Sequence, residues 1–304
     1  MKSCTGGLYA ILSRSSQTCQ GGLNFRVVVN RNELIRTVRD ETDPVRRVRL
    51  AGEAMTQLQQ GEVELSRLRR EAIEDAASAG LSYSEIARQV DLTRGRVSQI
   101  RSDSPPAERA FFGVGPLTLA VPLRPIQGRD QPVVASEDMQ ARNDLAELLN
   151  SLVFHVYPDE IDPRKRWRPA GDELIAICGP KSSPTIAELL STDPLLNFSE
   201  DSEGRWGITD RITEKRFESP MDDDPQQNGD VAYVGRLNLD KKRQLLLIAG
   251  VHAIGSVGAV HYLQGNVKRL YDKVGNENFS MVVASTNDGS DITASEESCP
   301  PEIH

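Results

Sequence analysis

The sequence of 304 residues has few aromatic side chains, few cysteines and no long apolar segment. Phe, Trp and Tyr make up 5% of the chain, and its longest apolar segments, such as Leu245–Ala249, have the length of a strand. A membrane-spanning helix needs about 20 predominantly apolar residues, so we expect no membrane partner. Leu8–Leu12 is too short for the apolar region of a signal peptide, which favours a cytoplasmic location.

The cysteines form no Cys-x-x-Cys pair and are irregularly spaced, at Cys4, Cys19, Cys178 and Cys299. This pattern argues against both a zinc site and a disulfide framework, and we expect no metal ion. We interpret the acidic run Asp222–Asp224 as a solvated loop instead of a metal site.

Positive charge is scarce in the second part of the chain. The net charge is −8, which argues against a general nucleic-acid coat. Residues 1–104 contain 16 Lys and Arg against 13 Asp and Glu, whereas residues 105–304 contain 20 against 31. Only the first part is therefore suited to face DNA.

Residues 31–102 have a helical pattern. Thr42-Asp43-Pro44 predicts a helix start, because a capping side chain precedes a proline. The apolar residues that follow share one helix face: Val45, Val48, Met55 and Leu58. This face could supply contacts for a homodimer or pack on the next helices, and the sequence does not decide between the two.

Residues 79–101 have the pattern of a helix-turn-helix. Ser82 and Glu85 predict a capping box, and Asp91-Leu92 predicts the turn. Thr93 is the expected N-cap of the second helix. The residues expected to face the core are Ile86, Ala87, Val90, Leu92, Val97 and Ile100. The outward set, which we predict to contact DNA, comprises Thr93, Arg94, Arg96, Ser98, Gln99 and Arg101.

These outward residues have the chemistry of a recognition helix. Arg pairs with guanine and Gln with adenine in the major groove, and a capped helix N-terminus can hold a phosphate. The segment 69–101 resembles the helix-turn-helix of sigma-70 region 4, through the motifs Gly-Leu-Ser-Tyr-x-Glu-Ile-Ala and Thr-Arg-Gly-Arg-Val-Ser-Gln-Ile. The resemblance implies that Arg94, Arg96, Ser98 and Gln99 face bases or phosphates. Gly95 stands where sigma factors often carry an acidic residue, and no region 2 is recognisable, so we do not classify the chain as a sigma factor.

In the second part of the chain, short apolar strands alternate with helical patterns. Examples are the strands Leu117–Leu123 and Leu174–Cys178 and the helices Asp138–Leu152 and Ile254–Leu263. This alternation predicts an α/β, Rossmann-like domain with a mostly parallel sheet. The polar segment Ser199–Gly229 is interpreted as an insertion.

These patterns divide the chain into five parts. They are a disordered leader over 1–30, a helical helix-turn-helix DNA-binding domain over 31–102, a linker over 103–115, a Rossmann-like α/β domain over 116–286 and an acidic flexible tail over 287–304.

Two strand-to-helix turns of the α/β domain look alike, because each strand ends at a glycine and enters a helix. Ligands of open α/β sheets lie at the carboxyl ends of strands, where helix N-termini favour anions. We predict a small anionic or nucleotide-like ligand there, contacted by Gly179, Lys181, Ser182, Ser183, Gly250, His252, Gly255 and Ser256. Neither turn matches a known nucleotide fingerprint, so tight helix-on-sheet packing also explains the glycines, and no cofactor is identified.

The sequence favours a sequence-specific, double-stranded-DNA-binding regulator of transcription with a ligand-sensing α/β domain, rather than an enzyme. The alternative is a nucleotide-processing enzyme that carries an autoregulatory DNA-binding domain, with His252 as candidate general base. A third interpretation is an adaptor that contacts RNA polymerase without binding DNA.

Overall fold

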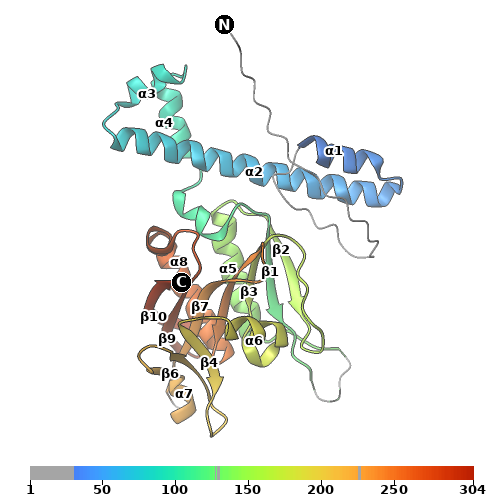
Figure 1. Ribbon diagram of the computed structural model, residues 1–304, viewed down its shortest axis with the longest axis vertical. Coiled ribbons are helices and arrows are strands. Elements are labelled where there is room, and N and C mark those ends of the chain that lie inside the picture. Colours follow the sequence, from blue (N-terminus) through green and yellow to red (C-terminus); the bar gives the residue numbers. More distant parts are fainter. Residues whose placement is uncertain (1–30, 127, 129–130, 225–226) are drawn as a thin grey trace.

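The computed structural model describes residues 31–126, 128, 131–224 and 227–304. A helical N-terminal part lies on one end of an α/β part (Figure 1). The predicted leader over 1–30 lies outside the described residues. In the part of the chain that the structure describes, no helix combines the length and the apolar character needed to cross a membrane.

Four helices form the N-terminal part: α1 (Arg31–Asp40), α2 (Pro44–Ser78), α3 (Tyr83–Gln89) and α4 (Arg94–Asp103). Helix α2 starts as predicted, because the Asp43 carboxylate accepts hydrogen bonds from the N–H groups of Val45 and Arg46. It has 35 residues and continues through Gly61 without a break. Helix α1 lies along its N-terminal end, and α3 and α4 lie at the other end (Figure 1).

The face of α2 that is buried differs from the predicted one. Leu50 and Ala54 are buried, as is Leu34 of α1, and Ile73 packs against α3 and α4. The predicted apolar face of Val45, Val48, Met55 and Leu58 is between 40% and 75% exposed. Packing of this face on the helix-turn-helix is therefore excluded.

The predicted linker over 103–115 is instead a packed connection. Two prolines end the helical pattern as expected, but Ala107–Phe112 forms the 3-10 helix η1, whose Phe111 and Phe112 enter the main core. Arg236 holds this segment by donating a hydrogen bond of 2.6 Å to the carbonyl oxygen of Phe111. Burial of two aromatic rings ties the helical part to the α/β part.

The central sheet has seven strands in the order β10-β9-β7-β8-β3-β1-β2. Their bounds are β1 (Leu117–Pro122), β2 (Val156–Ile161), β3 (Glu173–Ile177), β7 (Asp230–Asn238), β8 (Gln244–Gly250), β9 (Phe279–Asp288) and β10 (Asp291–Ile303). Strands β2, β1, β3 and β8 pair in parallel, whereas β7, β9 and β10 join by antiparallel pairing. Five of the seven strands thus run in one direction, which confirms an α/β fold with a mostly parallel sheet. The antiparallel pairings were not expected.

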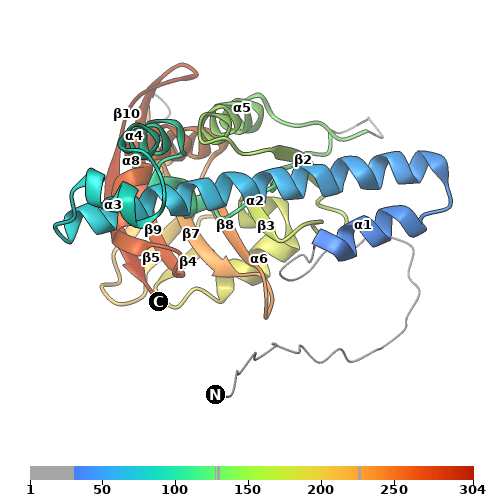
Figure 2. The ribbon, with the colours of Figure 1, turned by 90° about the horizontal axis from the view of Figure 1, so that it is seen from above.

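The sheet lies between two layers (Figure 2). Helices α5 (Ser136–Ser151) and α8 (Ala253–Val274) cover one face. The other face carries α6 (Pro184–Ser191) and a small antiparallel sheet of β4 (Leu196–Glu200), β5 (Trp206–Asp210) and β6 (Arg216–Glu218), followed by the short helix α7 (Pro220–Asp223). A strand that is covered on both faces has a continuous run of apolar residues in its sequence, as β3 and β8 have.

The predicted flexible tail over 287–304 is an ordered strand. Strand β10 pairs antiparallel with β9, with three irregularities in its register. Its Glu297 accepts hydrogen bonds from Tyr262 and Arg269 of α8. An edge strand carries polar side chains on its solvent side, so the acidic composition was misread as a sign of disorder.

Candidate functional site

The α3–α4 pair has the local structure that its sequence predicts. Ser82 Oγ accepts from the Glu85 N–H at 3.3 Å, and the Glu85 carboxylate accepts from the Ser82 N–H at 2.9 Å, which completes the capping box. Asp91 forms the turn with a φ of 54°, in the left-handed region that Asp tolerates. Thr93 Oγ1 accepts from the Arg96 N–H at 3.1 Å and caps α4.

A small apolar cluster holds α3 and α4 on α2. It contains Ile73, Ile86, Ala87, Val97 and Ile100, with Leu92 packed against it. Val90 departs from the prediction and is 53% exposed. Helix α3 ends at Gln89, so Val90 belongs to the turn and its side chain leaves the core.

Helix α4 presents a polar face to solvent. Of the residues predicted to contact DNA, the exposed ones are the N-cap Thr93 and Arg94, Arg96, Ser98 and Gln99 of α4. Arg96 Nη1 donates to Gln99 Oε1 at 2.8 Å, which aligns these two side chains on one face.

Arg101 is not part of this exposed face. It is half-buried, with its guanidinium 4.4 Å from the centre of the Tyr83 ring and no hydrogen-bond partner for Nε. A guanidinium over an aromatic face is a stabilising contact, so Arg101 packs between α3 and α4 instead of extending outward. The predicted DNA contact from Arg101 is therefore not supported by its position.

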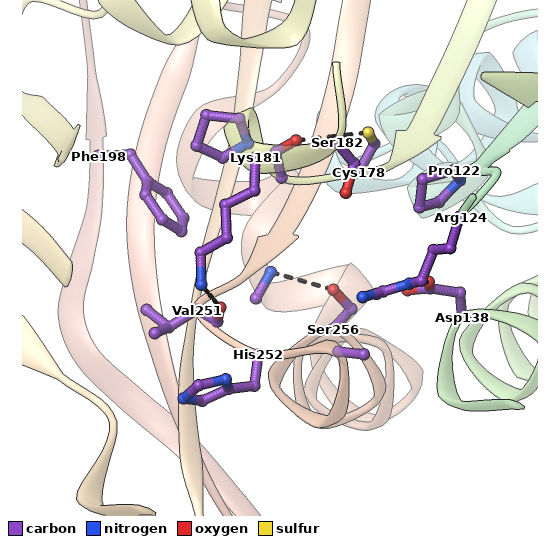
Figure 3. A pocket seen from close by; sticks show the side chains of 14 residues that line it. Pro122, Arg124, Asp138, Cys178, Lys181, Ser182, Phe198, Val251, His252 and Ser256 are labelled. Carbon is purple, nitrogen blue, oxygen red and sulfur yellow. Dashed lines mark hydrogen bonds and ion pairs between the residues drawn. The ribbon is translucent and has the colours of Figure 1, made fainter. Parts of the chain in front are cut away.

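A cleft with a volume of about 130 Å³ lies at the carboxyl ends of β1, β3 and β8 (Figure 3). The chain leaves β1 for α5 on one face of the sheet and leaves β3 for α6 on the other face. Such a switch point is where open α/β sheets bind ligands. The two glycine turns singled out in the sequence meet here, after β3 and after β8.

Six of the eight predicted ligand residues line the cleft: Gly179, Lys181, Ser182, Gly250, His252 and Ser256. Ser183 does not, because it is buried and its hydroxyl accepts from the Ile186 N–H to cap α6. Gly255 does not, because its N–H donates to Asp230 Oδ2 at 2.9 Å. A Cβ at Gly255 would lie 2.4 Å from that oxygen, so the glycine makes room for the carboxylate.

Asp230 occupies the N-terminal end of α8, where the sequence predicted an external anion. Its Oδ2 also accepts from the His252 N–H at 2.8 Å, and the residue is 1% exposed. Burial raises the pKa of this carboxyl to about 6. The chain thus supplies its own acidic group to the helix terminus, and the predicted ligand residues that remain are the six that line the cleft.

Basic side chains approach the cleft from opposite sides, Lys181 from one and Arg124 from the other (Figure 3). Lys181 Nζ donates to the carbonyl oxygen of Val251 at 3.1 Å, and burial lowers the pKa of its ammonium group. Arg124 Nη2 lies 2.8 Å from Asp138 Oδ2. Burial raises the pKa of the Asp138 carboxyl, and the bond to Arg124 opposes this shift.

His252 is held by a carboxylate at the same cleft. Its Nε2 lies 2.8 Å from Asp222 Oδ1, and 37% of the His252 side chain is exposed. The acidic run Asp222–Asp224, interpreted as a solvated loop, therefore contributes one residue that orients the imidazole.

Sequence reasoning missed Arg124, Asp138 and Phe198, which also line the cleft. Arg124 and Asp138 follow β1 and belong to no recognised motif. The signal that could find them is the rule that ligands lie at the carboxyl ends of strands, because β1 pairs in parallel with β3 and ends beside it.

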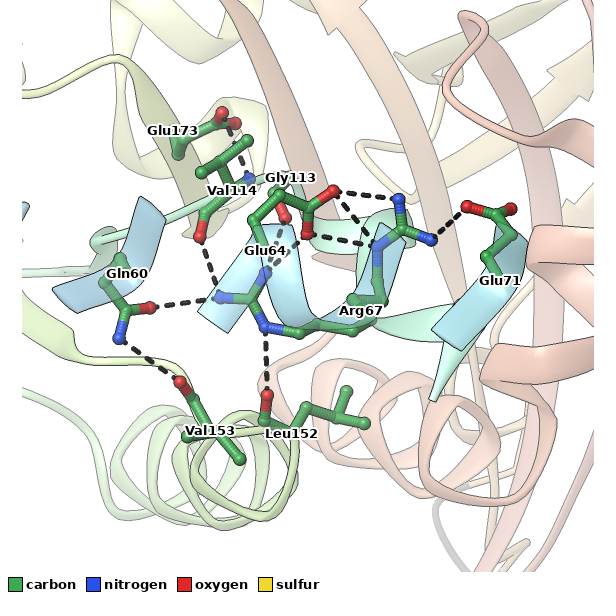
Figure 4. A network of polar contacts seen from close by, with 10 residues as sticks. Gln60, Glu64, Arg67, Glu71, Gly113, Val114, Leu152, Val153 and Glu173 are labelled. Carbon is green, nitrogen blue, oxygen red and sulfur yellow. Dashed lines mark hydrogen bonds and ion pairs between the residues drawn. The ribbon is translucent and has the colours of Figure 1, made fainter. Parts of the chain in front are cut away.

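A network of polar contacts joins α2 to the α/β part (Figure 4). At its centre is Arg109, which is 0% exposed. Its guanidinium donates to Glu64 at 3.0 Å and to Gln60 at 3.2 Å, both on α2. It also donates to the carbonyl oxygens of Leu152 at 3.1 Å and Val114 at 2.8 Å. One side chain thus bonds to both parts of the molecule.

Val114 extends this network to the start of β3. Its N–H donates to Glu173 at 3.3 Å, and burial raises the pKa of the Glu173 carboxyl. The other end of β3 enters the cleft through Cys178 and Gly179. A continuous series of contacts therefore runs from the cleft to α2.

Within the described ranges, no group of three or more His, Cys, Asp or Glu side chains is placed to hold a metal ion. The chain matches no family model, no curated protein and no solved structure. Its function must therefore be argued from the geometry of α4 and of the cleft.

Proposed function

We propose that this chain is a sequence-specific DNA-binding regulator of transcription, of the kind with a sigma-70 region 4-like helix-turn-helix. The observation that carries the proposal is the exposed face of α4, which presents Arg94, Arg96, Ser98 and Gln99 to solvent. The helix is capped at its N-terminus and packs on α2 through an apolar cluster. Arginine and glutamine read guanine and adenine in the major groove, and serine and a capping threonine suit phosphates. Such a regulator acts in the cytoplasm, with RNA polymerase as a further partner.

The distribution of charge supports this orientation toward DNA. Residues 81–102 contain four arginines against Glu85 and Asp91, whereas residues 105–304 contain 20 basic against 31 acidic residues. The acidic part repels DNA, so binding is restricted to the α4 face. We expect modest affinity, because few phosphates are contacted, and a salt dependence in proportion to their number.

The α/β part, which we propose to be a Rossmann-like sensor, binds a small anionic group in the cleft. Lys181 and Arg124 supply positive charge from opposite sides, and Ser182 and His252 supply hydrogen-bond donors. The volume of about 130 Å³ is below the roughly 300 Å³ of a typical drug-sized pocket. The ligand is therefore a small anion or the phosphate end of a nucleotide.

Ligand binding would alter DNA affinity through the contacts from β3 to Arg109 and α2. A ligand that favours one arrangement of this network shifts the population of α2 positions, and with it the placement of α4. Glu173 and Val114 lie between the two sites in this series of contacts.

DNA binding is tested by selecting duplexes from a random library and measuring affinity by fluorescence anisotropy at two salt concentrations. Arg94→Ala with Arg96→Ala should weaken binding at least tenfold, since a good base contact contributes about 1–3 kcal/mol. The matched control is Lys241→Ala with Lys242→Ala, which removes the same charge from an exposed turn of the α/β part. Equal affinity of the α4 variant and the wild type would refute the proposal.

Ligand binding is tested by calorimetric titration with inorganic phosphate and with nucleoside mono-, di- and triphosphates. We expect at least one of these to bind, and Lys181→Ala to weaken that binding while the exposed Lys241→Ala leaves it unchanged. Binding that is equal in wild type and Lys181→Ala would place the anion elsewhere.

The His252–Asp222 pair favours one other function, a nucleotide-processing enzyme with an autoregulatory DNA-binding domain. A histidine oriented by a carboxylate is the usual arrangement of a general base. This alternative predicts release of phosphate from a nucleotide by the wild type and its loss in His252→Ala. No turnover of the same nucleotide panel would exclude it in favour of a sensor.

A further inference from the structure

Helix α2 carries an exposed apolar stripe. It consists of Val45, Val48, Met55, Leu58, Leu65 and Leu68, each at least 40% exposed. Val48 is 75% and Leu65 is 68% exposed, although a surface helix usually turns its apolar face toward the core. Contiguous exposed apolar patches usually mark an interaction surface.

The spacing of the stripe is symmetric about one point of α2. Val45 and Leu68, Val48 and Leu65, and Met55 and Leu58 all share the same midpoint, between residues 56 and 57. At 3.6 residues per turn, the four inner residues lie within an arc of about 100°. A two-fold axis at this midpoint would place each of these four inner residues opposite its counterpart on an antiparallel copy.

We propose that the occupant of this stripe is a second copy of the same chain, with the two α2 helices crossing antiparallel around a two-fold axis between Met55 and Leu58. A two-fold interface uses the same patch on both subunits, which requires a self-complementary patch. The symmetric spacing of the stripe satisfies this requirement. Val48 of one copy then contacts Leu65 of the other.

The charges of α2 select the antiparallel arrangement. Residues 44–56 contain three arginines and one acidic residue, whereas residues 57–78 contain three arginines and five acidic residues. Glu64, Glu71 and Glu74 are paired within the chain. The exposed Arg47 and Glu62 lie near the stripe, and an antiparallel pair brings Arg47 of one helix within about one turn of Glu62 of the other. A parallel pair would bring like charges together.

The contacts of α2 within the chain leave the stripe accessible. Helix α1 packs where Leu50 and Ala54 are buried, and α3 and α4 pack at Ile73. Beside the stripe, a Cβ added at Gly52 or Gly61 would meet nothing within 4 Å. The two glycines lie at equal distances from the midpoint and on opposite sides of α2, so each leaves one edge of the stripe uncrowded.

This inference deepens the proposed function and rests on it for its biological role. Ile73 lies about 16 residues from the midpoint, so at 1.5 Å per residue the two α3–α4 units of a dimer would lie about 50 Å apart along the pair. Because half-sites one helical turn apart are separated by roughly 34 Å, we expect an operator with half-sites more than one turn apart.

The test is the oligomeric state of the full chain without DNA, measured by sedimentation equilibrium. The wild type should be a dimer. Val48→Glu should raise the dimer dissociation constant at least about tenfold, because a carboxylate would be buried against Leu65 of the other copy. The matched control is Ile212→Glu, another apolar residue that is 71% exposed, in the turn after β5. It should leave the dimer intact.

The antiparallel orientation of the two α2 helices is tested by combining Val48→Glu with Leu65→Lys in one chain. In the antiparallel pair the introduced opposite charges meet twice, and the dimer should recover, whereas in a parallel pair like charges would meet and it would not. A wild type that is monomeric at its highest soluble concentration, or a double variant no better than Val48→Glu, would overturn the proposal. Circular dichroism confirms that each variant is folded. Dimerisation is measured without DNA, so its failure is distinct from a failure of DNA binding.

Discussion

Arg109→Ala should separate the helical part from the α/β part more effectively than any other single substitution in their interface. The guanidinium is fully buried and donates to Glu64 and Gln60 on α2 and to two backbone carbonyl oxygens beyond it. It also lies 3.9 Å from the centre of the Phe154 ring. Alanine would remove this donor from Gln60 and from the Leu152 and Val114 carbonyl oxygens, and would leave the Glu64 carboxylate, which is 15% exposed, paired with Arg67 alone.

We expect Arg109→Ala to lower the free energy of unfolding by about 3–5 kcal/mol, which is the usual cost of removing one partner of a buried ion pair. For a unit of this size, such a loss lowers the thermal midpoint by roughly 10 °C. Urea unfolding followed by far-ultraviolet circular dichroism measures the free energy directly. The control Arg39→Ala removes an exposed arginine of α1 and should change it by less than about 0.5 kcal/mol.

A double-mutant cycle with Glu64→Ala isolates the contact between the two side chains. We expect the double variant to be less destabilised than the sum of the single variants by about 1–3 kcal/mol. Additive effects, or a cost of Arg109→Ala below about 1 kcal/mol, would refute the view that this network joins the two parts.

Three further predictions concern the α/β part. Burial raises the pKa of Asp230 to about 6, so its contribution to stability is complete below about pH 4 and lost as the pH rises to about 6. Relative to Asp230→Asn, the wild type should therefore lose on the order of 2 kcal/mol over this range in urea unfolding, and a constant difference would contradict the burial argument. Deleting residues 289–304 removes β10 and exposes the edge of β9, so we expect aggregation or a clearly lower midpoint in thermal unfolding; an unchanged midpoint would show that β10 is dispensable. Burial raises the pKa of the Cys178 thiol, so its peptide should resist alkylation by iodoacetamide until denaturant is added, whereas rapid native labelling would show that the cleft opens to solvent.

The local structure of α3 and α4 could be predicted in detail because its signals are local. Ser82 with Glu85, Thr93 as a cap, and Val97 with Ile100 each act over one turn of helix, and the structure has all of these features. Arg101 and Val90 were misplaced, because their positions depend on where α3 ends and on the Tyr83 ring across the pair.

The cleft could be predicted only in part, because its geometry depends on strand order. The glycines after β3 and β8 indicated two of its sides, but Arg124 and Asp138 join it through the placement of β1 beside β3. Gly255 was assigned to a ligand because no local pattern shows that Asp230, 25 residues earlier, approaches its backbone.

Composition was a poor guide to order at the boundaries of the α/β part. The two prolines before η1 and the acidic residues of β10 both suggested unstructured chain. In the structure, Phe111 and Phe112 bury their rings in the core and β10 pairs along β9. Burial and strand pairing with distant segments outweighed the local preference in both places.

The most direct test of the central claim is the affinity of the full chain for a duplex selected from a random library. We predict specific binding that weakens with salt and falls at least tenfold in the Arg94→Ala, Arg96→Ala variant, while the Lys241→Ala, Lys242→Ala control binds like the wild type. Failure of the selection to enrich any sequence, or equal binding by the α4 variant and the wild type, would contradict the assignment of α4 as a recognition helix.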